Sequence, residues 1–201
     1  LGRQWHHDGS HLRKQNSIND FVDVAKYLIE EGWTTPEMLG IEGRSAGGVL
    51  IGGAMNEAPE LFRTALLVVP FLDPLIAMED PSLPLTSLEY LEWGNPQVEE
   101  ELQVMKQWSP MQNVQSGTAA YPSVLALGGL NDNRVPYWEP LKYVATLRHE
   151  AKDGNLALVK IDRNVGHSVG GNQTKYFQIM SELYSFFLDQ VIGVGRMNES
   201  L

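Results

Sequence analysis

The segment Gly43-Arg44-Ser45-Ala46-Gly47 places one serine between two glycines, directly after a short apolar run. This G-x-S-x-G pattern is typical of a tight strand-to-helix turn that holds a serine hydroxyl clear of its neighbours, ready to act as a nucleophile. In this interpretation both glycines are needed because they carry no Cβ atom that would collide in so tight a bend. The pattern alone is weak, since about one 200-residue chain in fifteen would contain it by chance, and a flexible turn is the alternative. Its position between an expected strand and an expected helix favours the nucleophile.

A serine hydroxyl is a poor nucleophile at neutral pH, so it needs a general base and a carboxylate that orients that base. In chains with this turn, the three groups follow the order Ser, then Asp or Glu, then His. Asp132 and His167 each follow an apolar, strand-like stretch and complete that order after Ser45. The rivals for the carboxylate are less suitable, because Asn131 carries no charge and Asp162 ends the strand that precedes His167 and lies too near it.

His167 is the histidine placed to act as the base. The other four are expected to face solvent, three of them ahead of the serine turn and one in a helical stretch: His6, His7, His11 and His149. We therefore expect His167 to accept the Ser45 proton and return it to the leaving group, while Asp132 holds the imidazole tautomer. The backbone N–H of Ala46, at the start of a helix, is expected to donate to the oxyanion.

The elements that must position these residues alternate between strands and helices. Such alternation predicts right-handed βαβ units and a parallel sheet. The predicted strands are residues 37–42, 64–70, 121–129 and 156–162, and the predicted helices are residues 17–32, 47–58, 139–152 and 176–191. Ser17 and Asp20 give the first helix a start that resembles a capping box, and residues 1–16 are expected to form a loop. The long segment 71–115 interrupts this alternation of strands and helices. An insertion of this length is typical of a lid or substrate pocket over the strand ends, although a plain surface excursion is the alternative.

Composition narrows the class of protein. The 201 residues carry a net charge of −10, which argues against a nucleic-acid partner. The absence of cysteine excludes disulfides and thiolate metal sites and is compatible with a reducing, cytoplasmic compartment. No apolar stretch is long enough for a membrane span, and the first residues do not form a signal peptide.

The chain opens on Leu1 rather than methionine, which indicates a processed product or a fragment. Neither a metal-ligand cluster nor a phosphate-binding loop is evident, so no metal and no cofactor are expected.

Several stretches of the chain resemble the catalytic domain of the prolyl oligopeptidase family of serine peptidases, and within it the oligopeptidase B branch. They are GRSAGG, VPFLDPLIAMEDPSLPLT, EYLEWGNP, WSPMQNV, GLNDNRVPYWEPLKYVATLR and GHSVGG. The resemblance implies an α/β-hydrolase fold, with a mostly parallel sheet flanked by helices, over residues 1–192, followed by a tail at 193–201. It also implies that short peptides are the substrates, because a β-propeller domain in this family screens the active site.

The resemblance assigns roles to individual residues as well. It carries the catalytic triad onto Ser45, Asp132 and His167, in agreement with the spacing. Arg134 matches an arginine that contacts the substrate backbone in this family. Glu89 matches the first of two pocket carboxylates that bind a Lys or Arg side chain in oligopeptidase B, while Leu91 replaces the second. Because a lone carboxylate gives weaker charge-assisted pairing, the preference for basic residues is expected to be weakened or replaced. Without the resemblance, the acidic, proline-flanked surroundings of Glu89 favour a solvated acid over a pocket residue.

The chain departs from the family in what it lacks. The strands that precede the serine's own strand are missing, and so are an upstream tyrosine that supplies a second oxyanion donor and the propeller. A sheet truncated there would expose an apolar edge. Two other functions therefore stay open beside the peptidase. One is an esterase or lipase built on the same triad, and the other is a catalytically inactive fragment or binding protein.

Overall fold

The computed structural model describes residues 2–117, 121–151, 156–168 and 172–198. Within them, four parallel strands form one sheet in the order β1-β2-β3-β4, so each new strand is added beside the previous one. The strands are β1 (Gly40–Arg44), β2 (Thr64–Val68), β3 (Ser123–Gly129) and β4 (Ala157–Asp162). The predicted parallel α/β sheet is confirmed, although β1 begins three residues later than expected.

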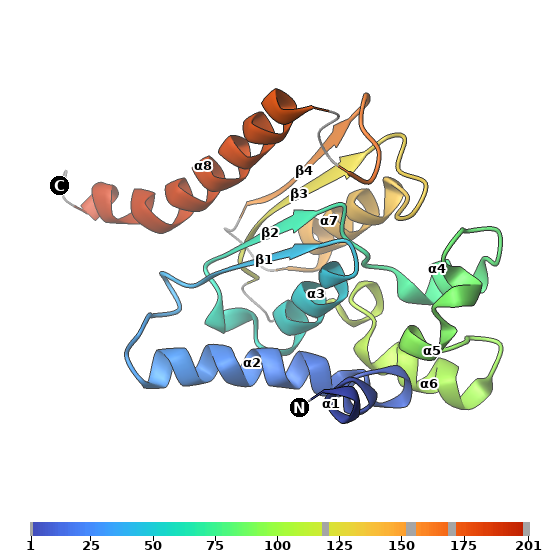
Figure 1. Ribbon diagram of the computed structural model, residues 1–201. Coiled ribbons are helices and arrows are strands. Elements are labelled where there is room, and N and C mark those ends of the chain that lie inside the picture. Colours follow the sequence, from blue (N-terminus) through green and yellow to red (C-terminus); the bar gives the residue numbers. More distant parts are fainter. Residues whose placement is uncertain (1, 118–120, 152–155, 169–171, 199–201) are drawn as a thin grey trace.

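Helices cover both faces of this sheet (Figure 1). The α-helices are α1 (Arg3–Asp8), α2 (Gln15–Glu30), α3 (Gly47–Glu57), α4 (Pro74–Glu79), α5 (Tyr90–Trp93), α6 (Glu99–Trp108), α7 (Trp138–Glu150) and α8 (Gln173–Asn198). Short 3₁₀ helices lie at η1 (His11–Arg13), η2 (Pro59–Leu61), η3 (Thr86–Leu88) and η4 (Met111–Asn113). Helices α2, α3 and α7 supply the core on one face, whereas α8 packs on the other.

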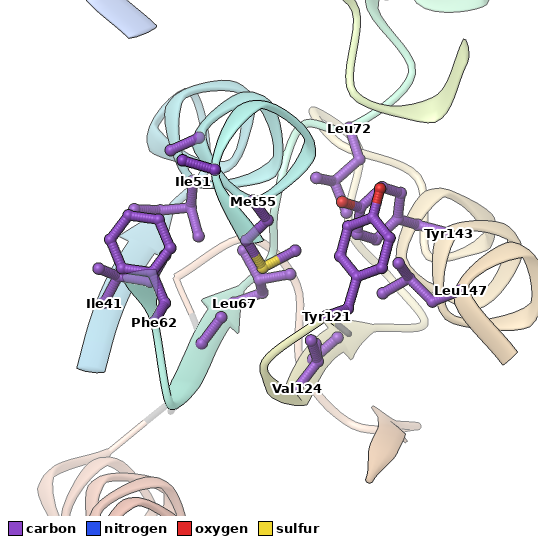
Figure 2. Close-up of a cluster of buried hydrophobic side chains, with 14 of the residues drawn as sticks. Ile41, Ile51, Met55, Phe62, Leu67, Leu72, Tyr121, Val124, Tyr143 and Leu147 are labelled. Atoms are coloured by element: carbon purple, nitrogen blue, oxygen red, sulfur yellow. The ribbon is translucent and has the colours of Figure 1, made fainter. Parts of the chain in front are cut away.

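The central strand β2 shows why its residues form a buried strand. All five of its residues are buried. Ala65 and Leu67 point into the cluster shared with α3 and α7, and the alternate residues Leu66 and Val68 pack with α8 on the opposite face. Because successive side chains on a strand point to opposite faces, a continuous apolar run suits a strand covered on both sides. Figure 2 shows Leu67 beneath Met55 of α3 in this core.

Several predicted boundaries at the ends of the chain differ from the structure. Residues 1–16 were expected to form a loop, but they contain α1 and η1. Helix α2 begins at Gln15, before the predicted capping box, and the Ser17 hydroxyl donates to the carbonyl of Gly9 at 2.7 Å instead of capping α2. Helix α8 continues to Asn198, so residues 193–198 are helical rather than tail. Lys152, the predicted last residue of the helix 139–152, lies outside the described residues, as do residues 199–201 of the expected tail.

The long segment between β2 and β3 folds into α4, η3, α5, α6 and η4. Figure 1 shows these elements beside the end of the sheet toward which the strands point. Phe71, Trp93, Met105 and Trp108 of this segment form a hydrophobic cluster together with Ile18 of α2 and Val49 of α3. The segment is therefore a packed cap next to the carboxyl ends of the strands, as expected for a part of the chain that builds a substrate pocket.

The edge of the sheet at β1 is unpaired within the described residues. Its exposed side chains are Glu42 and Arg44, so β1 itself presents charge there rather than the apolar edge that we expected. Exposed apolar side chains on α2 and on the connection that leads into β1 include Val24, Tyr27, Trp33 and Met38, and the exposed Tyr184 of α8 lies beside Glu42. No helix in the part of the chain that the structure describes is long and apolar enough to cross a membrane.

Candidate active site

Ser45 follows the last residue of β1 and sits in a strained turn. Its φ is +52°, in the left-handed region that few non-glycine residues adopt. Hydrogen bonds hold this conformation on both sides: the Ser45 N–H donates to the carbonyl of Val68 at 3.0 Å, and the Ser45 carbonyl accepts from the N–H groups of Phe71 at 2.9 Å and Gly48 at 2.8 Å. The neighbouring strand β2 and the segment after it therefore force the turn. Strain of this kind typically persists at functional sites.

The glycines required around Ser45 are only partly those of the motif. A Cβ atom at Gly43 would lie 2.4 Å from a side-chain carbon of Ile51 and 2.6 Å from the carbonyl oxygen of Gly47, so this glycine is required. The expectation for Gly47 is wrong, because a Cβ atom there would meet no described atom within 4 Å. Gly48 is the second required glycine, since a Cβ atom there would lie 2.7 Å from the backbone nitrogen of Phe71.

The loops after β3 and β4 are joined by hydrogen bonds, and this pairing carries the acid and the base to the same place. The N–H of Leu130 donates to the carbonyl of Asp162 at 2.9 Å, and the N–H of Asn131 donates to that of Val165 at 3.1 Å. The Asn131 side chain donates to the carbonyl of Arg163 at 3.0 Å. Asn131, which is unsuitable as the triad acid, therefore helps to hold the two loops together.

Ser45, His167 and Asp132 form a continuous hydrogen-bonded chain. The His167 Nε2 lies 2.8 Å from the Ser45 Oγ, and the His167 Nδ1 lies 2.8 Å from the Asp132 Oδ2. The other carboxylate oxygen accepts the N–H groups of Arg134 at 2.9 Å and Val135 at 3.0 Å. The Asp132 side chain is 0% exposed and the His167 side chain 14% exposed, which keeps competing water from the carboxylate. The structure thus brings together the three residues that the spacing had singled out.

The rival acid Asp162 is engaged elsewhere. Its carboxylate forms an ion pair with Lys175 at 2.6 Å and accepts the N–H of Asn164 at 2.9 Å. The hydrogen bond from Lys175 lowers the pKa of Asp162. Asp162 therefore anchors the start of α8, and Asp132 is the carboxylate in contact with His167.

The remaining histidines lie away from this site. His6, His7 and His149 are exposed, as expected. The expectation of solvent exposure is wrong for His11, which is partly buried and has its Nε2 2.9 Å from a carboxylate oxygen of Glu101 on α6. Among the described residues, no cluster of three acidic or histidine side chains could hold a metal ion.

One hollow borders Ser45 and a second borders the adjacent start of α3, and Glu89 lines both. The smaller has a volume of about 40 Å³ and is lined by Ser45, Ala46, Phe71, Ala77, Met78, Leu83, Leu85, Thr86, Glu89, Arg134 and Val135. The larger has a volume of about 440 Å³ and includes Ala46, Gly47, Glu89 and Trp93 in its lining. The two residues predicted to contact substrate, Glu89 and Arg134, therefore lie beside Ser45. Leu91 lines neither hollow and is 84% exposed, so its replacement of a carboxylate does not alter their walls.

Ala46 immediately precedes α3. The first N–H groups of a helix have no acceptor within the helix, and they carry the positive end of its dipole. Ala46 also lines both hollows. Its N–H therefore belongs to the positive start of α3 and lies next to Ser45 in the chain.

Sequence reasoning missed two residues that support this site. Arg44 donates from its guanidinium to the carbonyl of His167 at 3.1 Å and so ties the end of β1 to the histidine loop. Glu139, at the start of α7, is buried and accepts the N–H groups of Leu72 at 2.8 Å and Asp73 at 3.1 Å. Burial raises the pKa of Glu139 to about 7. Arg44 occupies a variable position of the serine motif, and Glu139 lies outside every motif. The sequence therefore did not indicate a supporting role for either residue.

Comparisons with known proteins agree with the geometry. The model of the Prolyl oligopeptidase family matches residues 1–193. Protease 2 from Moraxella lacunata is 39% identical over 191 residues, covering 95% of this chain and 27% of that protein. Dipeptidyl aminopeptidase BI from Pseudoxanthomonas mexicana is 38% identical over 195 residues, covering 97% of this chain and 27% of its own length. The structure of oligopeptidase B from Trypanosoma brucei with covalently bound antipain, in its closed form, superposes with a TM-score of 0.88 at 41% identity, over 92% of this chain and 26% of that one. The chain thus spans about a quarter of the length of the curated relatives that it matches.

Proposed function

The chain belongs to the prolyl oligopeptidase family, and from this premise we propose that it carries the acyl-transfer site of a serine peptidase that hydrolyses short peptides. Its sheet has the α/β-hydrolase fold of that family, as the sequence resemblance implied. The observation that carries the proposal is the position of the His167 imidazole, which bridges the Ser45 hydroxyl and the Asp132 carboxylate at 2.8 Å on each side. This is the geometry that general-base activation of a serine requires.

The first half of the reaction forms an acyl-enzyme. His167 Nε2 accepts the hydroxyl proton while Ser45 Oγ attacks the carbonyl carbon of the scissile peptide bond. The imidazolium that forms is stabilised by Asp132, whose carboxylate is itself fixed by two backbone N–H groups. His167 then gives the proton to the leaving amine as the C–N bond breaks. In the second half His167 accepts a proton from a water molecule as its oxygen attacks the ester carbonyl, and then returns that proton to Ser45 Oγ as the ester C–O bond breaks and the carboxylic acid product leaves.

The negative charge of each tetrahedral intermediate needs preorganised donors. The Ala46 N–H at the start of α3 is proposed as one of them, supported by its place next to Ser45. The family resemblance implies a second donor from a tyrosine outside this chain, and loss of one such donor typically lowers kcat by about 10²–10³. A β-propeller that restricts access to short peptides is likewise proposed from the resemblance. The match to this chain covers about a quarter of each relative, and the tyrosine and the propeller are both proposed to belong to the part of the family's length outside that match.

The substrate is proposed to carry a basic side chain next to the cleaved bond, bound by Glu89, with Arg134 on the peptide backbone. Both residues line the hollow beside Ser45, which supports these roles. A hollow with two charged residues also favours a peptide over a lipid ester, because a lipid pocket would be apolar throughout. The cysteine-free composition supports a proposed cytoplasmic location.

Matched substrates test this function. The natural polypeptide would be assayed with peptide amides that end in Arg or Pro before the same fluorogenic amine, and with the corresponding Arg ester. We expect cleavage of the Arg amide at a higher kcat/KM than the Pro amide, and loss of both activities in Ser45→Ala. Turnover of the ester without turnover of either amide would instead establish an esterase, and no turnover of any substrate would establish an inactive member of the family.

A further inference from the structure

The pocket carboxylate Glu89 is held by a single neutral donor. The indole N–H of Trp93 donates to the Glu89 Oε2 at 2.7 Å. One turn of helix separates the two residues, and the backbone N–H of Trp93 also donates to the Glu89 carbonyl at 3.0 Å. Backbone and side chain of Glu89 are therefore tied to the same residue, which restricts the rotamers that the carboxylate can adopt.

Trp93 is itself rigid, so it can serve as a fixed donor. It is 4% exposed and packs edge-on against Phe71, with ring centroids 5.4 Å apart. Trp108 lies on another side at 6.2 Å, and the Lys14 ammonium lies 4.5 Å from the centre of the Trp93 ring. Phe71 lines the hollow beside Ser45, so the indole that orients Glu89 packs against a wall of the same hollow.

Of the three glutamates around α5 (Glu89, Glu92 and Glu101), Glu89 is the one without an ionic partner among the described residues. The neighbouring acid Glu92 is paired with Lys14, and Glu101 lies 2.9 Å from His11. Within the described ranges no cationic side chain forms an ion pair with Glu89, and the indole N–H is the partner of its carboxylate. A neutral donor fixes the direction of the carboxylate but does not cancel its charge, and it leaves Oε1 free to accept from a ligand.

We propose that Trp93 is a positioning residue for substrate specificity: its indole N–H holds the Glu89 carboxylate so that Oε1 meets a guanidinium or ammonium group of the substrate. The inference rests on the proposed function, because it presumes that Glu89 binds a basic side chain. A fixed orientation of Glu89 would also explain how this chain binds a basic side chain with one carboxylate, although Leu91 supplies no second carboxylate. A preoriented carboxylate loses little freedom on binding, and this raises its selectivity for a cation.

The test compares the natural polypeptide and its variants on two peptide amides that differ only in arginine or citrulline before the cleaved bond. Citrulline has the shape of arginine without its charge, so the ratio of the two kcat/KM values measures recognition of the cation. Active sites would be counted by fluorophosphonate titration of Ser45, which removes effects of misfolded enzyme. Trp93→Phe removes the N–H and keeps an aromatic ring. Replacement of Trp93 by benzothienylalanine, which has sulfur in place of the N–H, keeps the size of the indole if Trp93→Phe does not fold.

Trp108→Phe is the matched control, because Trp108 is buried in the same aromatic cluster but its indole N–H has no hydrogen-bond partner among the described residues. We expect Glu89→Gln to lower the arginine-to-citrulline ratio by about tenfold or more and loss of the Trp93 N–H to lower it by about three- to tenfold. Trp108→Phe should leave the ratio unchanged. In the Glu89→Gln background Trp93→Phe should cause no further fall, since the two residues act as one unit.

An equal loss on both substrates in either Trp93 variant, or a further fall in the double variant, would overturn the role of Trp93 while leaving the peptidase intact. A ratio unaffected by Glu89→Gln in an active enzyme would reject the basic preference itself, and the inference with it.

Discussion

Glu139→Gln should remove a pH dependence of stability that the buried carboxyl creates. Glu139 is 2% exposed, and burial raises its pKa from 4.5 to about 7 in the folded chain. The folded state therefore holds this proton more tightly than the unfolded state, and its stabilising effect is fully present below about pH 4.5 and is lost as the pH rises through about 7. For these two pKa values, linkage gives a loss of about 2.5 kcal/mol in the free energy of unfolding between pH 5 and pH 8.

The measurement is urea unfolding followed by tryptophan fluorescence at several pH values between 5 and 8, for wild type, Glu139→Gln and Glu60→Gln. Glutamine can still accept from the N–H groups of Leu72 and Asp73, but it does not ionise. We expect the stability of Glu139→Gln relative to wild type to rise by about 2.5 kcal/mol from pH 5 to pH 8. The exposed Glu60 provides the control, which should follow wild type throughout. A stability difference between Glu139→Gln and wild type that stays constant with pH would refute the assignment of a raised pKa to this buried carboxyl.

Three further predictions concern the serine turn and its partners. Asp132→Asn should lower kcat by about 10⁴ with little change in KM, because the imidazole loses the acceptor that sets its tautomer; steady-state kinetics on a peptide amide would show this, and a fall of less than tenfold would contradict it. Gly43→Ala should lower the melting temperature by several degrees, because its Cβ would lie 2.4 Å from Ile51, whereas Gly47→Ala should leave it unchanged or slightly raised; equal melting temperatures for the two variants in a thermal scan would count against close packing at Gly43. Arg44→Ala should lower kcat by about two- to tenfold through loss of its hydrogen bond to the histidine loop, and an unchanged kcat would show that this bond does not position the base.

The parts of the site that the sequence predicts are those that follow from topology. Parallel strands end at the same edge of a sheet, so a serine, an aspartate and a histidine placed just after successive strands are expected to converge. The structure brings Ser45, Asp132 and His167 into hydrogen-bond contact for this reason. The buried strand β2 was equally predictable, because an uninterrupted apolar run fits a strand that is covered on both faces.

The supporting contacts were not predictable, because they depend on how distant segments pass one another. The need for Gly48 arises from the path of the chain after β2, which brings the Phe71 backbone against the start of α3. Burial of Glu139 depends on the same path, and its role could not be separated from that of any other helical glutamate. The start of α2 also differs from the prediction, since the side chain of Ser17 bonds to Gly9 in a segment that was expected to be a loop.

Covalent labelling of Ser45 tests the central claim most directly. The natural polypeptide would be treated with a fluorophosphonate, and the modified peptide identified by mass spectrometry. We expect one adduct on Ser45 that is absent in Ser45→Ala and forms at least about 10³ times more slowly in His167→Ala, because the histidine activates the hydroxyl. An adduct on a different residue, or labelling of Ser45 at the same rate without the imidazole, would contradict the proposal that these side chains act as a nucleophile and its base.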